Sequence, residues 1–210
     1  MKERSLVVVS AGLSQPSSTR LLADRLTAAT ERRMREQKFE PRTTVLELRE
    51  HAQDLVNHLL TGFPAPALGG AIEAVLRADG LIAVTPIFSA SYSGLYKMFF
   101  DLLERDGLAG KPVLIGATGG TARHSLALEH AIRPLFAYLN AAVVPTAVYA
   151  AAEDWGRADM AAQPGLAERI ERAGGELADW VARREPMAAP DPFDDPIPFR
   201  ELLDSTRPPG

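Results

Sequence analysis

The stretch "SLVVVSAGLSQPSSTRLL" (residues 5–22) changes its character twice over a short distance. It opens with an unbroken apolar run at residues 6–9, which predicts a strand buried on both faces. A loop rich in serine follows, and then Leu21, Leu22 and Leu26 recur at helical spacing. A buried strand that leads through a polar loop into an amphipathic helix is the repeating unit of α/β folds.

The same alternation of apolar runs and helical patterns continues along the chain. Further strands are expected at residues 43–48, 80–86 and 142–150, and at residues 111–120 together with a glycine loop. Helices are expected at residues 17–37, 51–60, 72–78, 93–104, 124–141 and 166–183. Because strands and helices alternate, and because the strands are apolar throughout, the sequence predicts an α/β fold with a parallel sheet.

The composition changes after residue 184. Residues 185–210 contain seven prolines, which prevent a regular helix or a central strand over most of this segment. We therefore expect one domain at residues 1–184 and a proline-rich C-terminal tail or arm at residues 185–210. The tail is either disordered or an extended arm that docks on another subunit through Phe193, Ile197, Phe199 and Leu202.

The overall composition is that of an ordinary globular protein. The chain has 210 residues, of which 46% are hydrophobic, and a formal net charge of −4, so nothing indicates a basic surface for nucleic acid. It contains no cysteine, which excludes disulfides, thiolate catalysis and cysteine-ligated metal sites. The apolar run near the N-terminus is too short for a signal peptide or a membrane span. We expect a cytoplasmic protein that binds neither nucleic acid nor membrane.

In a parallel sheet the carboxyl ends of the strands meet at one edge, and ligands bind there. The loop after the first predicted strand carries five hydroxyls around a helix start: Ser10, Ser14, Ser17, Ser18 and Thr19. The free N–H groups and partial positive charge of a helix N-terminus favour an anion, so we expect a phosphate here. The alternative is a simple helix cap, although one cap needs only one hydroxyl. The loop matches neither the Walker A nor the GxGxxG pattern.

Two more loops at the same predicted edge are unusual. In "TPIFSASYSGLYKMFFDLL" (residues 85–103), Pro86 ends a strand, the small residues 89–91 allow a flat ligand to approach the backbone, and Phe88 can cover it. In "GATGGTARHS" (residues 116–125), the glycines expose backbone N–H and C=O groups. The alternative for both loops is an ordinary strand–helix connection with capping hydroxyls. Together the three loops describe a monophosphate pocket beside a flat slot, which fits flavin mononucleotide (FMN).

The order of these segments resembles the NADPH-dependent FMN reductases, and the resemblance covers roughly residues 5–150. The second loop is similar to that family's "TPEYNxSxPGxLKNxLDWL"-like segment at Thr85, Pro86, Ser91, Gly94, Leu95, Lys97, Asp101 and Leu103. The opening stretch looks like an actinobacterial-type branch of the family. The resemblance implies a flavodoxin-like three-layer sandwich with a five-stranded parallel sheet of order 2-1-3-4-5. The first loop departs from the family pattern, because it is one residue longer and lacks the family's arginine.

The resemblance also implies which residues bind the cofactor. Phosphate contacts would come from Ser17 and Thr19, with Ser10, Ser14 and Ser18 as further hydroxyls. The ribityl chain and ring would be lined by Pro86, Phe88, Ser89, Ala90 and Ser91. The polar edge of the ring would lie near Thr118, Gly119 and Gly120.

The resemblance implies an enzyme that uses FMN and either NADPH or NADH. The hydride transfer is cofactor chemistry that requires no catalytic side chain, and the sequence shows no Ser/His/Asp order and no metal-spaced His pair. A homodimer or homotetramer is expected, and a flavin-dependent monooxygenase is a candidate partner for the reduced flavin. The alternatives are a quinone, azo or chromate-type reductase on the same fold, or a flavodoxin-like binding module without turnover.

Overall fold

The computed structural model of the protein describes residues 2–155 and 164–184. The strands are β1 (Lys2–Ser10), β2 (Phe39–Glu47), β3 (Gly80–Phe88), β4 (Ser91–Tyr92), β5 (Pro112–Gly119), β6 (Ala142–Val143) and β7 (Val148–Ala151). The α-helices are α1 (Ser18–Glu36), α2 (Ala52–Thr61), α3 (Pro66–Arg77), α4 (Gly94–Asp101), α5 (Arg133–Tyr138) and α6 (Pro164–Arg183). The predicted tail at residues 185–210 lies outside the described residues, so the predicted domain division stays a prediction.

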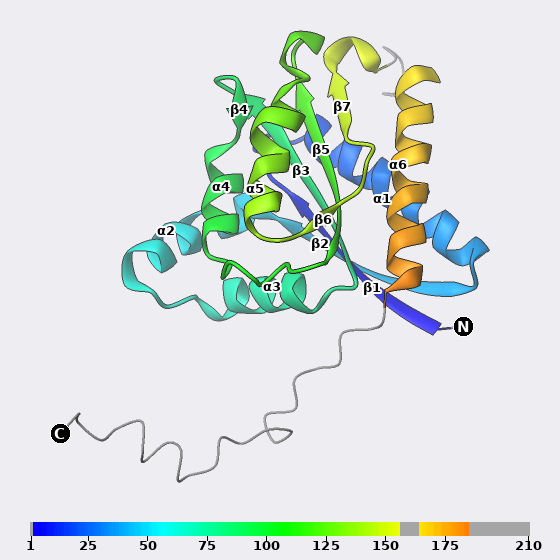
Figure 1. Cartoon of the computed structure of the whole chain (residues 1–210). Helices are drawn as coiled ribbons and strands as arrows, with labels where there is room; N and C mark the ends of the chain where they lie inside the picture. The colour runs from blue at the N-terminus through cyan, green and yellow to red at the C-terminus, as the bar shows by residue number, and fades with distance from the viewer. Residues whose placement is uncertain (1, 156–163, 185–210) are drawn as a thin grey trace, which may run out of the picture.

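The main strands form a parallel sheet in the order β2-β1-β3-β5-β6, and β7 also pairs with β5 in parallel. Helices α1 and α6 cover one face of the sheet, and α2 to α5 lie on the other side (Figure 1). If β5 is counted as the fourth parallel strand and β6 with β7 as the fifth, the predicted order 2-1-3-4-5 and the three-layer sandwich are confirmed. The short β4 folds back on β3 as an antiparallel partner.

The core explains why the strands are apolar throughout. Leu6 and Val8 of β1 point into the cluster formed with α1 and α6, whereas Val7 and Val9 point into the cluster on the opposite face. All four side chains are buried. Side chains alternate between the two faces of a strand, so a strand covered by helices on both faces needs apolar residues at every position.

The prediction of one continuous fifth strand at residues 142–150 is wrong. This segment divides into β6 and β7, and the break contains Pro145, which has no N–H to donate to β5. The next residue, Thr146, donates its backbone N–H to the Glu176 carboxylate of α6 at 2.7 Å instead. The strand therefore leaves the sheet for a few residues and rejoins it where Val148 pairs with Gly116.

Two predicted helices also differ from the structure. The helix expected at residues 124–141 is interrupted: a 3₁₀ turn (Ala122–His124) and a π-helical segment (Leu128–Ile132) precede α5. Pro134 lies inside this stretch and cannot donate the hydrogen bond that a continuous α-helix requires. Helix α3 begins earlier than the expected residue 72, because Pro66 is accommodated in its first turn.

Among the described residues, no single helix has the length and apolar character needed to cross a membrane. The segments Leu48–Thr61 and Pro66–Arg77 reach that length and composition only as a pair, and they are bent by 88° relative to each other. Leu48, Leu55 and Leu68 of these segments are fully buried in the core.

Gly174 and Gly175 of α6 offer a matched test of the packing between α6 and α1. A Cβ at Gly174 would lie 2.8 Å from the Ala29 Cβ and 2.9 Å from the Thr30 backbone nitrogen, whereas a Cβ at Gly175 would meet nothing within 4 Å. We predict that Gly174→Ala lowers the free energy of unfolding by about 1–3 kcal/mol through overpacking. Gly175→Ala is expected to raise it by about 0.5–1 kcal/mol through helix propensity. Chemical denaturation measures both, and equal effects would contradict the close approach of the two helices.

Candidate active site

A cavity of about 710 Å³ opens at the carboxyl edge of the sheet. Its lining comes from the loops after β1 and β5, from the carboxyl end of β3, and from β7 with the segment that follows it. The lining residues are Leu13, Ser14, Ser17, Ser18, Thr19, Pro86, Ile87, Phe88, Thr118, Gly119, Gly120, Ala150, Ala152 and Trp155. The three loops that the sequence singled out thus meet at one cavity, whose volume lies in the range of small-molecule and cofactor pockets.

The first loop brings the N-terminus of α1 to this cavity. Ser17 is the N-cap of the helix, and its hydroxyl accepts a hydrogen bond from the Arg20 backbone N–H at 3.2 Å. A side chain at Gly12 would place its Cβ 2.1 Å from the Ser17 hydroxyl, so only glycine allows the loop to fold this closely over the helix start. As a cap acceptor, the Ser17 hydroxyl still has its own proton to donate. The cap explains one of the five predicted hydroxyls, and Ser14 and Ser18 remain exposed beside it.

A hydrogen bond between two buried hydroxyls joins the first loop to the third. The Thr19 and Thr118 hydroxyl oxygens lie 2.8 Å apart, and the two residues are 2% and 4% exposed. The two groups belong to β1–α1 and β5, which are separated in the sheet by β3. One hydroxyl donates and the other accepts, so the accepting hydroxyl keeps a proton that can be offered to a ligand.

The glycine loop rests on a tyrosine that the sequence analysis did not identify. The Tyr149 hydroxyl of β7 donates to the Thr121 carbonyl at 2.8 Å, and a Cβ at Gly119 would lie 2.0 Å from that hydroxyl oxygen. Burial raises the pKa of Tyr149, and the nearby Asp154 and Glu153 carboxylates raise it further. The hydroxyl therefore stays protonated and keeps the glycine loop in place over a wide pH range.

Some predicted site residues do not line the cavity. Ser10 is buried at the end of β1, and its hydroxyl has no hydrogen-bond partner among the described residues. Ser89 and Ala90 form the turn between β3 and β4, both with positive φ, and Ser91 begins β4. The small residues at 89 and 90 thus serve a tight hairpin at the rim of the cavity. Their predicted contacts with a ligand stay a prediction.

Apolar side chains flank the opening of the cavity. Leu13 from the first loop is 52% exposed, and Phe88 at the end of β3 is 48% exposed. Trp155, which follows a 3₁₀ turn (Ala152–Asp154) after β7, lines the wall and is almost fully buried. Trp155 was not among the predicted site residues, because it follows the fifth predicted strand and not the first, third or fourth. The same edge rule applied to the fifth strand would have found it.

Comparison with known proteins agrees with this geometry. The sequence model of a family described as NADPH-dependent FMN reductase matches residues 4–156. The chain belongs to this family. An NADPH-dependent FMN reductase of Pseudomonas aeruginosa is 35% identical over 182 residues, which cover 87% of this chain and 95% of that protein. The family assignment confirms the predicted NAD(P)H:FMN oxidoreductase, with FMN and NADPH or NADH as cofactors, over the alternative of a non-catalytic module.

Solved structures of similar proteins support the same family and fold. An oxidoreductase of Corynebacterium diphtheriae is 43% identical, with a TM-score of 0.83, and the match covers 88% of this chain and all 100% of that one. The apo form of the NADH:FMN oxidoreductase EmoB is 28% identical, with a TM-score of 0.73, over 89% of this chain and 92% of that one. Membership of the FMN reductase family is thus supported along most of the described chain. The predicted actinobacterial-type branch stays a prediction.

The hydroxyl pair provides a test of how the first and third loops are joined. We predict that Thr19→Val and Thr118→Val each lower the free energy of unfolding by about 1–3 kcal/mol, because each leaves a buried hydroxyl without its partner. The double variant should lose about 1 kcal/mol less free energy of unfolding than the sum of the two single losses, because no unpaired hydroxyl remains. Chemical denaturation of the wild type, the two single variants and the double variant gives the coupling free energy between the two hydroxyls.

Thr27 supplies the control for this cycle. It lies on the same helix, and its hydroxyl bonds to the Ala23 carbonyl at 2.8 Å, away from Thr118. Thr27→Val combined with Thr118→Val should therefore be additive. A Thr19–Thr118 cycle that is also additive would show that the hydroxyls do not couple the two loops.

Proposed function

We propose that FMN is bound in the cavity at the carboxyl edge, with its phosphate at the N-terminus of α1 and its ring along the glycine loop and the rim of β3. When bound, FMN supplies the redox chemistry by accepting a hydride from the reduced nicotinamide. The observation that carries the placement is the cavity itself, which joins a hydroxyl-rich helix N-terminus to a glycine loop and an apolar wall. The protein's own part is to bind and orient both nucleotides.

The phosphate end is built from neutral donors. Ser17 and Ser18 stand at the first turn of α1, where the backbone N–H groups have no partner within the helix. Their hydroxyls, and the spare proton of the Thr19–Thr118 pair, add donors around the same point. A phosphate at this position would also gain from the partial positive charge of the helix terminus.

The ring end is flatter and more apolar. The backbone of Thr118, Gly119 and Gly120 forms one side, and a Cβ at Gly120 would meet nothing within 4 Å. A flat ligand can thus lie directly against this backbone, whose N–H groups can donate to the polar edge of the ring. Phe88 at the end of β3 and Trp155 after β7 supply aromatic surface elsewhere in the lining.

The open rim of the cavity supports a proposal about the use of the reduced flavin. The exposed Leu13 and Phe88 leave the cavity accessible from solvent, which suits a flavin that is reduced and then released. We therefore propose that this reductase supplies reduced FMN to a flavin-dependent monooxygenase. We also propose that it works in the cytoplasm as a homodimer or homotetramer, in which a second subunit adds to the rim of the cavity without closing it.

The function is tested by following nicotinamide oxidation with purified protein, FMN, and either NADPH or NADH. We predict oxidation that depends on FMN and that has a KM for riboflavin at least about tenfold higher than for FMN, because riboflavin lacks the phosphate and its charge-assisted hydrogen bonds. Ser18→Ala should narrow this difference by raising the KM for FMN alone. Equal KM values for FMN and riboflavin would refute the phosphate site at α1, and no oxidation with either nucleotide would refute the activity.

A further inference from the structure

The loop that carries the proposed phosphate site has little packing of its own. Residues 13–16 are all exposed. The cavity of about 710 Å³ lies on one side of the loop, and a second hollow of about 350 Å³ lies on its other side. The second hollow lies between this loop, the first turns of α1, and Glu47 and Arg49. With hollows on both sides, the shape of the loop depends on a few polar contacts rather than on a packed core.

Arg49 provides these contacts from a neighbouring strand. It lies in the 3₁₀ turn (Leu48–His51) directly after β2, which pairs with β1, so the end of β2 brings it beside the first loop. Its Nη1 approaches the Ser14 carbonyl at 3.5 Å. With the Gln15 amide turned so that its oxygen faces the guanidinium, that oxygen accepts from Arg49 Nη1 at 2.9 Å and also from Nη2.

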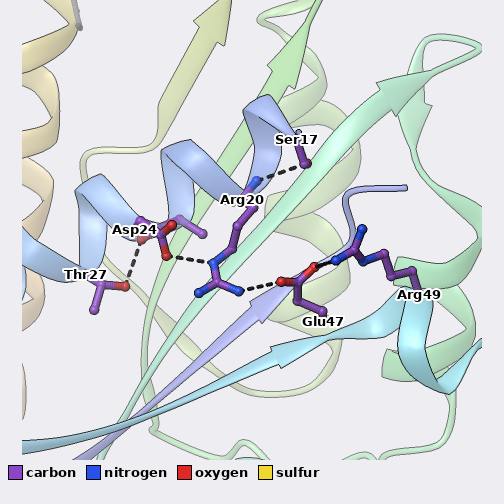
Figure 2. Close-up of polar contacts among 7 residues, drawn as sticks. Ser17, Arg20, Asp24, Thr27, Glu47 and Arg49 are labelled. Carbon is purple, nitrogen blue, oxygen red and sulfur yellow. Dashed lines mark hydrogen bonds and ion pairs between the residues drawn. The ribbon is translucent and has the colours of Figure 1, made fainter. Parts of the chain in front are cut away.

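Glu47 fixes Arg49 in this position. One carboxylate oxygen of Glu47 lies 2.8 Å from Arg49 Nη2, and the other accepts from Arg20 Nη1 at 2.5 Å. Arg20 is held in turn by Asp24, whose carboxylate is 2.7 Å from its Nε (Figure 2). Glu47 and Arg49 are only 16% and 19% exposed, so this pair is more shielded from solvent than a typical surface ion pair.

Among the residues that the structure describes, no arginine or lysine lines the cavity of the proposed phosphate site. Figure 2 shows the Arg20 guanidinium turned toward Glu47 and Asp24, while its backbone nitrogen faces Ser17. The two arginines and two carboxylates sum to no net charge. Their contribution to phosphate binding is therefore one of shape rather than of attraction.

We propose that Glu47 and Arg49 are positioning residues that hold the first loop in its phosphate-binding shape and thereby set the preference for FMN over riboflavin. This inference rests on the proposed FMN site. Ordering a free loop residue costs about 1–2 kcal/mol of conformational entropy, so a loop that is already ordered before binding retains more of the phosphate's interaction energy. Riboflavin makes no use of the phosphate contacts, so its affinity is independent of this network.

The decisive experiment compares Glu47→Gln and Arg49→Ala with the wild type. Apoprotein is titrated with FMN and, separately, with riboflavin, and binding is followed by quenching of flavin fluorescence. We expect both substitutions to raise the Kd for FMN about tenfold, which corresponds to the cost of ordering about one loop residue on binding, and to leave the Kd for riboflavin unchanged. Arg49→Lys keeps the charge but loses the planar fork, so an intermediate Kd for FMN is expected.

Glu47→Gln separates positioning from simple attraction. The substitution makes the neighbourhood of the loop more positive, so attraction alone predicts tighter FMN binding, whereas positioning predicts weaker binding. Glu3→Gln is the matched control, because Glu3 pairs with Arg42 at 2.5 Å on the same two strands at their opposite ends. That variant should bind both flavins as the wild type does.

The remaining outcomes distinguish this inference from the proposed function. Glu47→Gln that binds FMN as tightly as the wild type, or that weakens FMN and riboflavin equally, overturns the positioning role and leaves the FMN site standing. Wild-type protein that fails to prefer FMN over riboflavin overturns both proposals. Thermal unfolding of each variant identifies any loss of the fold. If Glu47→Gln and Arg49→Ala do not fold, the Kd values of Arg49→Lys, which retains the pairing charge, decide the question: a raised Kd for FMN with an unchanged Kd for riboflavin supports the positioning role, and an unchanged Kd for FMN overturns it.

Discussion

The site depends on the in-register parallel pairing of β1, β3 and β5. All three strands run in the same direction, so their carboxyl ends face one edge of the sheet. Ser10 at the end of β1 pairs with Val84, and Val84 pairs with Gly116, while β3 and β5 continue beyond this level to Phe88 and Gly119. The chain therefore leaves the sheet three times at one rim, and short loops are enough to enclose a cavity there. The buried side chains of the strands fix this register, because a slip by one residue would move each of them to the opposite face. Packing in the core thus decides where the polar loops meet.

The strands could be predicted because a strand that is buried on both faces has apolar residues at every position of its sequence. The unbroken apolar runs around Val8 and Ile82 have no other simple explanation in a chain of this composition. The same rule fails at the fifth strand, where residues 142–150 look continuous. There the geometry is decided by Pro145 and by a carboxylate on α6, which takes the Thr146 N–H. A contact that depends on a side chain thirty positions away leaves no trace in the local pattern.

The site was predictable to the extent that its chemistry lies within single loops. Serines around a helix start and glycines after a strand are local signals, and most of the residues that carry them line the cavity, although Ser10 does not. Tyr149 and Arg49 are different, because each contacts a loop that it does not belong to. Their types are ordinary, and only the folded sheet brings them to the loops. The turn at Ser89 shows why such a local signal is ambiguous, since a small residue that suggests close approach to a ligand also suits a hairpin.

The electrostatics of the proposed phosphate site suit a flavin that must leave. A bidentate arginine on the phosphate would add charge-assisted hydrogen bonds worth about 1.5–3 kcal/mol each, which slows release by the same factor that it strengthens binding. Here the nearby guanidinium of Arg20 is engaged by Asp24 and Glu47 instead. In the proposed site, hydroxyls and the helix terminus would hold the phosphate with moderate strength. A loop of fixed shape would keep the preference for FMN over riboflavin without the stronger binding that an arginine on the phosphate would give. The proposed role of Arg49 and the proposed release of reduced FMN therefore depend on each other.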